Sequence, residues 1–280
     1  MPLPNGLITY GPNANCTLEL CKAEWSVVGY QPNVPANAFF LAAFAASALI
    51  HLAQGIFYWR KGRPTWGFTT VIVTGCLDEI VGYIGRLLLH DNPFSFGAFL
   101  MQIICVTTAP VFFCAAIYVT LSQTIYFIDP SKSRFDPRWF YWVFIPCDII
   151  SLVLQAAGGA MSSVSTTEAA VNRGVDISLA GLVFQVVTLV AFSALFIDYL
   201  WSCGFLGALF GGKAKRAAAG EKAAAAERSF PRPLRLFLVF LFLATLFIFI
   251  RCAYRVKELS EGYFSEFFRE ETLFIVLESV

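Results

Sequence analysis

Long hydrophobic runs, separated by short segments rich in Pro, Gly or charge, make up most of this chain. About 20 apolar residues in a helix cross the roughly 30 Å hydrocarbon core of a bilayer. Lipid offers backbone groups no hydrogen-bond partners, so such runs must be helical. The pattern predicts spans at residues 38–59, 66–89, 96–127, 139–161, 176–201 and 234–254, and an incomplete seventh at 271–280. We therefore expect an all-α polytopic membrane protein, a seven-transmembrane-helix bundle whose seventh helix is truncated.

Basic residues are distributed unevenly between the predicted loops. The loops after the first, third and fifth spans carry 13 Lys and Arg, and the opposite side carries six. Cytoplasmic loops are enriched in Lys and Arg, which predicts an outer N-terminus and a cytoplasmic C-terminus. Residues 1–37 then form an extracytoplasmic tail, residues 38–280 the membrane domain, and residues 202–233 a basic cytoplasmic loop.

Composition supports the membrane assignment. Hydrophobic residues make up 58% of the 280 positions and charged residues 14%, against about 45–50% and 25% in soluble proteins. The net charge of +1 provides no basic field that would attract nucleic acid. We expect membrane lipids, and no nucleic acid, as partners; the oligomeric state is left open.

The N-terminal segment carries features of an extracellular chain. Asn15-Cys16-Thr17 is a glycosylation sequon, so Asn15 is a candidate glycosylation site. Cys16 and Cys21 could form a local disulfide there. The other six cysteines lie in or beside apolar runs, where Cys behaves as a small hydrophobe.

Ionisable and amide side chains occur inside or at the ends of several spans, where a charge facing lipid is costly. Glu79 and Arg86 are seven positions apart and share one helix face. Two interpretations stay open: the charges pair to fix helix packing, for example Glu79 or Asp148 with Arg251, or they line a polar cavity for an amphipathic substrate. The candidate residues are Asp78, Glu79, Arg86, Asp148, Gln155, Gln185, Arg251, Arg255 and Glu271.

Several enzyme motifs are missing from the sequence. It has no Gly-rich phosphate-binding loop and no Gly-x-Ser-x-Gly nucleophile motif. Only His51 and His90 could supply imidazole ligands, so we expect no metal site, no cofactor and no catalytic residues. The sequence favours a protein that is not an enzyme.

Five ordered blocks resemble the fungal lipid-translocating exporter family, the 7-aminocholesterol-resistance-like or RTA-like proteins. The blocks are EIVGYIGR (79–86), APVFFCAAIYVTLSQTI (109–125), DIISLVLQAAGGAM (148–161), GLVFQVVTLVAF (181–192) and RCAYRVKELSEG (251–262). The polar residues of these motifs fall on Glu79, Arg86, Asp148, Gln155, Gln185, Arg251, Arg255, Glu258 and Glu271.

The resemblance implies a seven-helix plasma-membrane protein that exports or translocates sphingoid long-chain bases and confers resistance to toxic lipophiles. A sphingoid base combines one long chain with one ammonium, and buried acids suit that ammonium. Glu79 and Asp148 are the preferred binding residues, with Asp78 and Glu271 next. A sterol-like amphiphile is a second candidate substrate.

A seven-helix lipid or stress sensor that acts through partners, without transport, is the alternative. Seven helices with an outer N-terminus also describe G-protein-coupled receptors. The sequence has no Asp-Arg-Tyr after the third span and no Asn-Pro-x-x-Tyr in the seventh, which disfavours a standard receptor.

Overall fold

The protein is an all-helical bundle in the computed structural model, as the hydrophobic pattern predicts. The structure describes residues 6–63, 65–128, 133–134, 136–165, 167–203, 232–261 and 271–278. Its helices are η1 (Ala23–Trp25), α1 (Val34–Arg60), α2 (Trp66–Asp91), α3 (Phe96–Ile128), α4 (Trp139–Val164), α5 (Glu168–Ser202), α9 (Arg232–Glu261) and α10 (Glu271–Glu278).

Most helix ends lie within a few residues of the predicted span ends, with two exceptions. α5 begins at Glu168 rather than at residue 176, and α9 continues to Glu261 rather than ending at residue 254. Hydrophobicity marks where a helix crosses lipid, whereas the helix itself can continue into the polar layer. The predicted basic loop falls mostly on residues 204–231, which lie outside the described residues.

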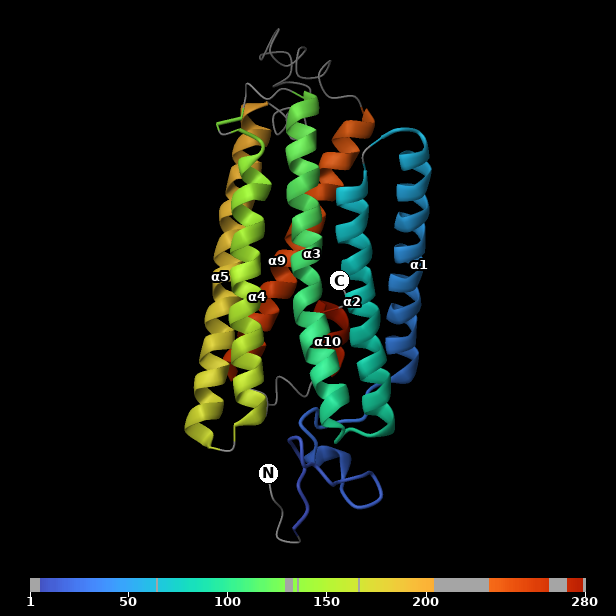
Figure 1. Ribbon diagram of the computed structural model, residues 1–280, viewed down its shortest axis with the longest axis vertical. Coiled ribbons are helices and arrows are strands. Elements are labelled where there is room, and N and C mark those ends of the chain that lie inside the picture. Colours follow the sequence, from blue (N-terminus) through green and yellow to red (C-terminus); the bar gives the residue numbers. More distant parts are fainter. Residues whose placement is uncertain are drawn as a thin grey trace, which may run out of the picture.

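The long helices lie side by side along the longest axis, and α9 crosses them obliquely (Figure 1). We call the end that holds residues 6–33 the tail end, at the bottom of Figure 1, and the opposite end the loop end. α2 packs between α1 and α3, and α4 packs along α5. α10 starts at the tail end and contacts α9.

Five of the described helices are long and apolar enough to cross a membrane: α1, α3, α4, α5 and α9. α2 is of similar length and lies among them (Figure 1), but Asp78, Glu79 and Arg86 interrupt its hydrophobicity. The described part of α10 has eight residues, which give about 12 Å of helix. The chain is an integral membrane protein.

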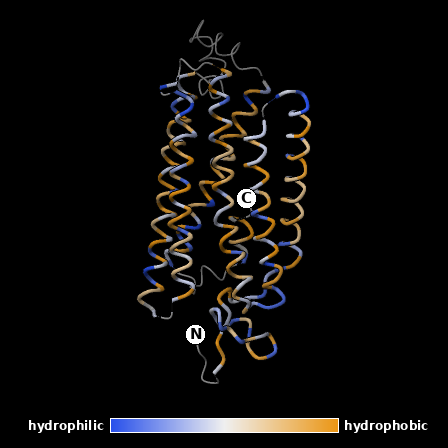
Figure 2. Tube along the Cα trace, in the orientation of Figure 1, coloured by the Kyte–Doolittle hydropathy of each residue, from blue (hydrophilic) through white to orange (hydrophobic). Residues whose placement is uncertain are grey.

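Hydrophobic side chains cover the outside of the bundle as well as its interior. Figure 2 shows hydrophobic residues along the length of the helices, with hydrophilic residues concentrated near the ends and in the tail. Leu49, Trp142 and Val187 are among the large hydrophobic residues that are more than half exposed. A surface of this kind is stable only when lipid covers it.

Glycines bring α4 and α5 into backbone contact. A Cβ built on Gly158 would meet the backbone nitrogen of Ser178, and one built on Gly174 would lie 2.5 Å from the backbone nitrogen of Ser162. Small residues let membrane helices approach this closely because no side chain separates the backbones. Gly82 and Gly85 play the same part where α2 meets α3.

Aromatic rings fill the loop-end half of the bundle. Tyr118 of α3, Phe140 and Phe144 of α4, and Phe192 and Phe196 of α5 belong to one buried hydrophobic cluster. The rings of Tyr118 and Phe192 have centroids 4.5 Å apart, and those of Phe144 and Phe192 are 5.5 Å apart. We call these five residues the aromatic cluster.

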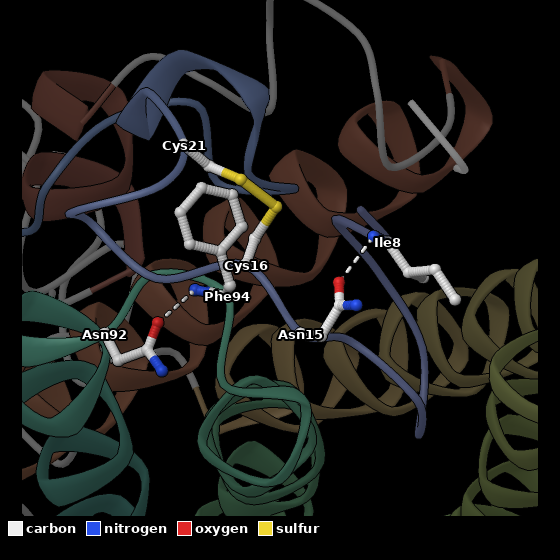
Figure 3. The surroundings of a disulfide bond; sticks show 6 residues. All are labelled: Ile8, Asn15, Cys16, Cys21, Asn92 and Phe94. Carbon is white, nitrogen blue, oxygen red and sulfur yellow. Dashed lines mark hydrogen bonds between the residues drawn. A yellow bond between two sulfur atoms is a disulfide. The ribbon is translucent and has the colours of Figure 1, made fainter. Parts of the chain in front are cut away.

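The tail is folded onto the ends of α2 and α3. A disulfide joins Cys16 to Cys21, and both residues pack with Phe94 in the turn between these helices (Figure 3). Val27 and Val28 form a second buried cluster there with residues of α2 and α3. The exposed Asn15 accepts a 2.7 Å hydrogen bond from the Ile8 amide through its side-chain oxygen (Figure 3), so its side-chain nitrogen is not used in that bond.

Gly158→Ala should lower the stability of the bundle, because a methyl group there meets the backbone of α5. We expect a loss of about 1–3 kcal/mol in the free energy of unfolding, typical of overpacking. Thermal unfolding in detergent measures it. Gly159→Ala is the matched control, since its Cβ would lie 4.0 Å from the nearest atom, Ser178 Oγ. Equal stability of the two variants would contradict close α4–α5 contact.

Candidate functional site

Glu79 and Arg251 form a buried ion pair between α2 and α9. Arg251 Nη2 lies 2.5 Å from Glu79 Oε1, and the Glu79 side chain is fully buried. The same nitrogen donates a 2.9 Å hydrogen bond to the Val106 carbonyl of α3. The pairing joins three helices, and it is one of the two pairings that the packing interpretation names.

Arg86 is held by groups from three parts of the chain. Its Nε donates to Asn37 Oδ1 of α1 at 2.8 Å, and its Nη2 donates to the Tyr30 hydroxyl at 3.0 Å. Glu271 Oε1 of α10 lies 3.7 Å from the same Nη2, and the Phe274 ring centroid lies 3.8 Å from the guanidinium carbon. Burial raises the pKa of Tyr30 above its ordinary value despite the adjacent Arg86, so its hydroxyl stays neutral. Arg86 and these contacting residues, which we call the Arg86 group, hold the tail end of α2 in place.

A second buried ion pair lies on α9. Arg255 Nη1 is 2.5 Å from Glu258 Oε2, one turn along the helix, and both side chains are at least nine-tenths buried. The Arg255 guanidinium lies 5.9 Å from the centroid of the Phe274 ring, whose other contact is Arg86. The pair therefore adjoins the Arg86 group through one aromatic ring.

Polar side chains on α4 form a separate line that faces α5. Gln155 Nε2 donates to Gln185 Oε1 of α5 at 3.0 Å, and Ser178 Oγ donates to the Gln155 carbonyl at 3.1 Å. Asp148 lies two turns further toward the loop end on α4 and is 1% exposed. Asp78 lies apart from these residues on α2, where its carboxylate accepts a hydrogen bond from Thr108 of α3.

A cavity of about 250 Å³ lies in the tail-end half of the bundle between α3 and α4. Apolar residues line most of it, and α5 and α9 also contribute. Arg255, Glu258 and Gln155 supply its most polar groups, together with the hydroxyls of Thr107, Thr108, Ser163 and Ser178. Its lining includes Ile104 and Val164, which are 52% and 71% exposed. The cavity thus reaches the lipid-facing surface of the bundle.

Tyr10 of the tail contacts residues at the tail end of this cavity. Its ring makes edge contacts with Phe96 and Phe99 of α3, and its hydroxyl hydrogen-bonds Ser163 of α4. Phe99 and Ser163 both line the cavity. Burial raises the pKa of Tyr10, so the hydroxyl meets the cavity rim as a neutral group.

The predicted site residues do not share one polar interior. Three of them, Gln155, Arg255 and Glu258, line the cavity. Gln185 adjoins it through Gln155, and Asp78 adjoins it through Thr108. The preferred residues Glu79 and Asp148 are outside its lining, as are Asp78, Arg86, Arg251 and Glu271. Within the described part of the chain, no group of His, Cys, Asp and Glu side chains could hold a metal ion.

Sequence reasoning missed several lining residues. Thr107, Thr108, Ser163 and Ser178 reach the cavity, but isolated Ser and Thr are common in membrane helices and carry no signal of their own. Tyr10 lies in the tail, whose position over α3 and α4 depends on tertiary packing. The sequence gives no separate signal that Tyr10 packs against α3 and α4.

A family model described as RTA1 like protein matches residues 72–280, well over half of the chain. The chain belongs to the RTA1-like family. Sphingoid long-chain base transporter RSB1 of Saccharomyces cerevisiae (strain Lalvin EC1118) is 34% identical over 178 residues, covering 62% of this chain and 44% of that protein. Probable lipid transporter atnI of Emericella nidulans is 26% identical over 200 residues, covering 70% of this chain and 49% of that protein.

Protoporphyrin uptake protein 1 of Saccharomyces cerevisiae is 33% identical over 129 residues, covering 45% of this chain and 41% of that protein. The chain thus spans about half the length, or less, of these curated relatives. No solved structure matches the chain. The names of these relatives describe transport or uptake, and two of them name lipids.

Glu79→Gln in this RTA1-like protein should destabilise the fold, because Arg251 would lose its buried counter-charge. Breaking a buried pair from one side costs about 3–5 kcal/mol. Arg251→Met in the same chain should restore part of the loss, which thermal unfolding of both single variants and the double variant would measure. The control is Lys257→Gln, since the Lys257 side chain is 61% exposed in its pair with Glu261. Additive losses in the double variant would contradict a coupled pair.

Proposed function

We propose that this chain binds a single-chain amphipathic lipid in the cavity between α3 and α4 and moves it between the bilayer leaflets. A sphingoid long-chain base is the favoured substrate. The observation that carries the proposal is the largely apolar cavity that reaches the lipid-facing surface and contains the buried Arg255–Glu258 pair. No enzymatic step is part of the proposal.

The apolar lining suits a hydrocarbon chain. Ile103, Leu152 and Leu182 line the cavity, and Ile104 and Val164 stand at its exposed edge. An acyl chain could enter between α3 and α4 from the membrane without crossing water, so its hydrophobic surface stays covered throughout. Binding pockets for small molecules are of this kind, mostly apolar with a few polar groups that orient the ligand.

The Arg255–Glu258 pair suits an amino-alcohol headgroup. An ammonium would bind the Glu258 carboxylate, and a headgroup hydroxyl would accept from Arg255 or bond Gln155. Because the pair lies on α9 next to the apolar lining, one ligand can contact the charges and the lining together. In this arrangement the headgroup contacts the charged pair while the hydrocarbon chain lies against the apolar lining and extends into the membrane between α3 and α4.

The relatives support this substrate class. Two proteins that share the RTA1-like sequence are named a sphingoid long-chain base transporter and a probable lipid transporter. A sterol-like amphiphile fits the cavity less well, since its rigid rings lack a cationic head for Glu258. Tolerance of toxic lipophiles would follow from removing them from the inner leaflet.

Ala156→Phe should block lipid exchange, because Ala156 lines the cavity and a ring there fills it. Liposomes with the purified protein and a fluorescent sphingoid base measure the exchange, which we expect to fall at least tenfold. Ala43→Phe is the matched control on the exposed surface of α1 and should keep the wild-type rate. Unchanged exchange with Ala156→Phe would refute the cavity as the lipid-binding site. If the wild type binds the lipid but does not exchange it, the result would favour a sensor.

Glu258→Gln should weaken binding of a sphingoid base and leave binding of an uncharged long-chain alcohol largely unchanged. The neutral amide cannot pair with an ammonium. The variant also removes the buried counter-charge of Arg255 and should lower the stability of the protein, but that effect is the same for both lipids. Fluorescence competition with the two lipids measures the difference. An equal loss for both lipids would indicate that the variant damages the cavity instead.

We further propose that the protein lies in the plasma membrane with the tail outside and the C-terminus in the cytoplasm. The excess of Lys and Arg in the loops at the loop end supports this orientation. Expressed in a fungal cell, the protein should carry a glycan on Asn15. Glycosidase treatment should then increase its gel mobility, and Asn15→Gln should remove that shift. If a protease cleaves the tail only from the cytoplasmic side, the orientation is the opposite of the one proposed.

A further inference from the structure

Asp148 is a buried acid for which the described residues provide no counter-charge. It lies near the middle of α4 and is 1% exposed. No described group lies within 3.5 Å and in good alignment with either carboxyl oxygen, and the Tyr118 hydroxyl of α3 makes a weaker hydrogen bond with the carboxyl. Glu79 at a comparable depth has Arg251. An ionised carboxylate at bilayer depth is costly without such a partner, so the surroundings of Asp148 favour its neutral form.

The titratable groups that face Asp148 are a hydroxyl and thiols, which cannot supply a positive charge. The Tyr118 hydroxyl and the Cys114 thiol face it from α3, and Cys252 of α9 lies next to Cys114. Gln155 pairs with Gln185 on the neighbouring stretch of α5. The acids nearest to Gln185 on α5, Asp176 and Asp198, are nine and 13 positions away, at least about 13 Å along the helix. The charged residues of α9 beside Cys252, Arg251 and Arg255, pair with Glu79 and Glu258.

One side of Asp148 leads toward the cavity. Ser151 donates to the Asp148 carbonyl at 2.9 Å, and Gln155 Nε2 lies 3.5 Å from Ser151 Oγ. Gln155 lines the cavity, as does Leu152, one turn from Asp148. A short line of polar groups therefore runs along α4 from the cavity to the backbone of Asp148, whose side chain lies one helix turn from the lining residue Leu152.

The other side of Asp148 is closed by apolar packing. Phe140 and Phe144 precede it on α4 and pack with Phe192 of α5 and Tyr118 of α3. These rings belong to the aromatic cluster, which is buried. Among the described residues, the loop-end side of Asp148 is therefore occupied mainly by aromatic rings, and the cavity lies on its tail-end side.

We propose that Asp148 is a proton-binding site that exchanges with the cavity, and that it couples lipid binding to proton release. With the cavity empty, the carboxyl holds a proton. A cationic headgroup in the cavity stabilises the ionised form, so the O–H bond breaks and the proton passes to cavity water as lipid binds. By linkage, protons and cationic lipid weaken one another's binding equally. The coupling rests on the proposed function, whereas the proton site itself does not.

Infrared difference spectroscopy of the protein in nanodiscs tests the proton site directly. We expect a carboxylic-acid carbonyl band at neutral pH that Asp148→Asn removes and Asp148→Glu shifts. Asp198→Asn is the matched control, because Asp198 has a counter-charge in the exposed Arg134 at 2.7 Å, and its removal should leave the band unchanged. A spectrum that is the same in wild type and Asp148→Asn would overturn the proposal.

Adding sphinganine to the protein in weak buffer tests the coupling. We expect one proton released per lipid bound by the wild type and none by Asp148→Asn. Lipid exchange without either the band or proton release would leave the proposed function standing and overturn Asp148 as a proton site. A band in a protein that neither binds nor exchanges sphinganine would refute the proposed function and the coupling, and leave the proton site.

Discussion

The hydrocarbon core of a bilayer provides no partner for an ionised side chain, and this constraint explains how the helices of the protein are joined. Glu79 of α2 can be buried because Arg251 of α9 reaches it. Arg86 can be buried because α1, the tail and α10 each bring a group to it. The charges thus decide which helices meet, and apolar packing then fills the space around them. For Glu79 and Arg86, the packing interpretation accounts for their burial without any ligand.

The two halves of the bundle differ in what fills them. At the loop end, the aromatic cluster joins α3, α4 and α5 in a continuous core. At the tail end, α3 and α4 leave a cavity between them, backed by α9 and bordered by Tyr10. Glycine contacts hold α2 to α3 and α4 to α5 much more closely. An opening between α3 and α4 therefore separates two tightly packed helix pairs and leaves each pair intact.

The sequence was sufficient for the fold class and for most helix positions, because apolar run length responds directly to bilayer thickness. It also identified nearly all of the buried charged residues, since a charge in an apolar run is conspicuous. It could not show which of these residues have a counter-charge in the folded protein. Glu79 and Asp148 look alike as acids within spans, and only the crossing of α9 gives one of them an arginine. The cavity depends on helix separation and on single Ser and Thr residues, for which sequence periodicity carries no information.

The order in which the chain is made gives the Glu79–Arg251 pair one more consequence. During synthesis α2 enters the membrane first, and α3, α4 and α5 all follow before α9 brings Arg251. Until then Glu79 has to stay near water or hold a proton, so α2 cannot reach its final depth as a charged helix. The helix α2 therefore reaches its final position in the membrane late in biogenesis. Substitutions in α9 should therefore expose α2 to membrane quality control even where they leave the insertion of α9 itself unaffected.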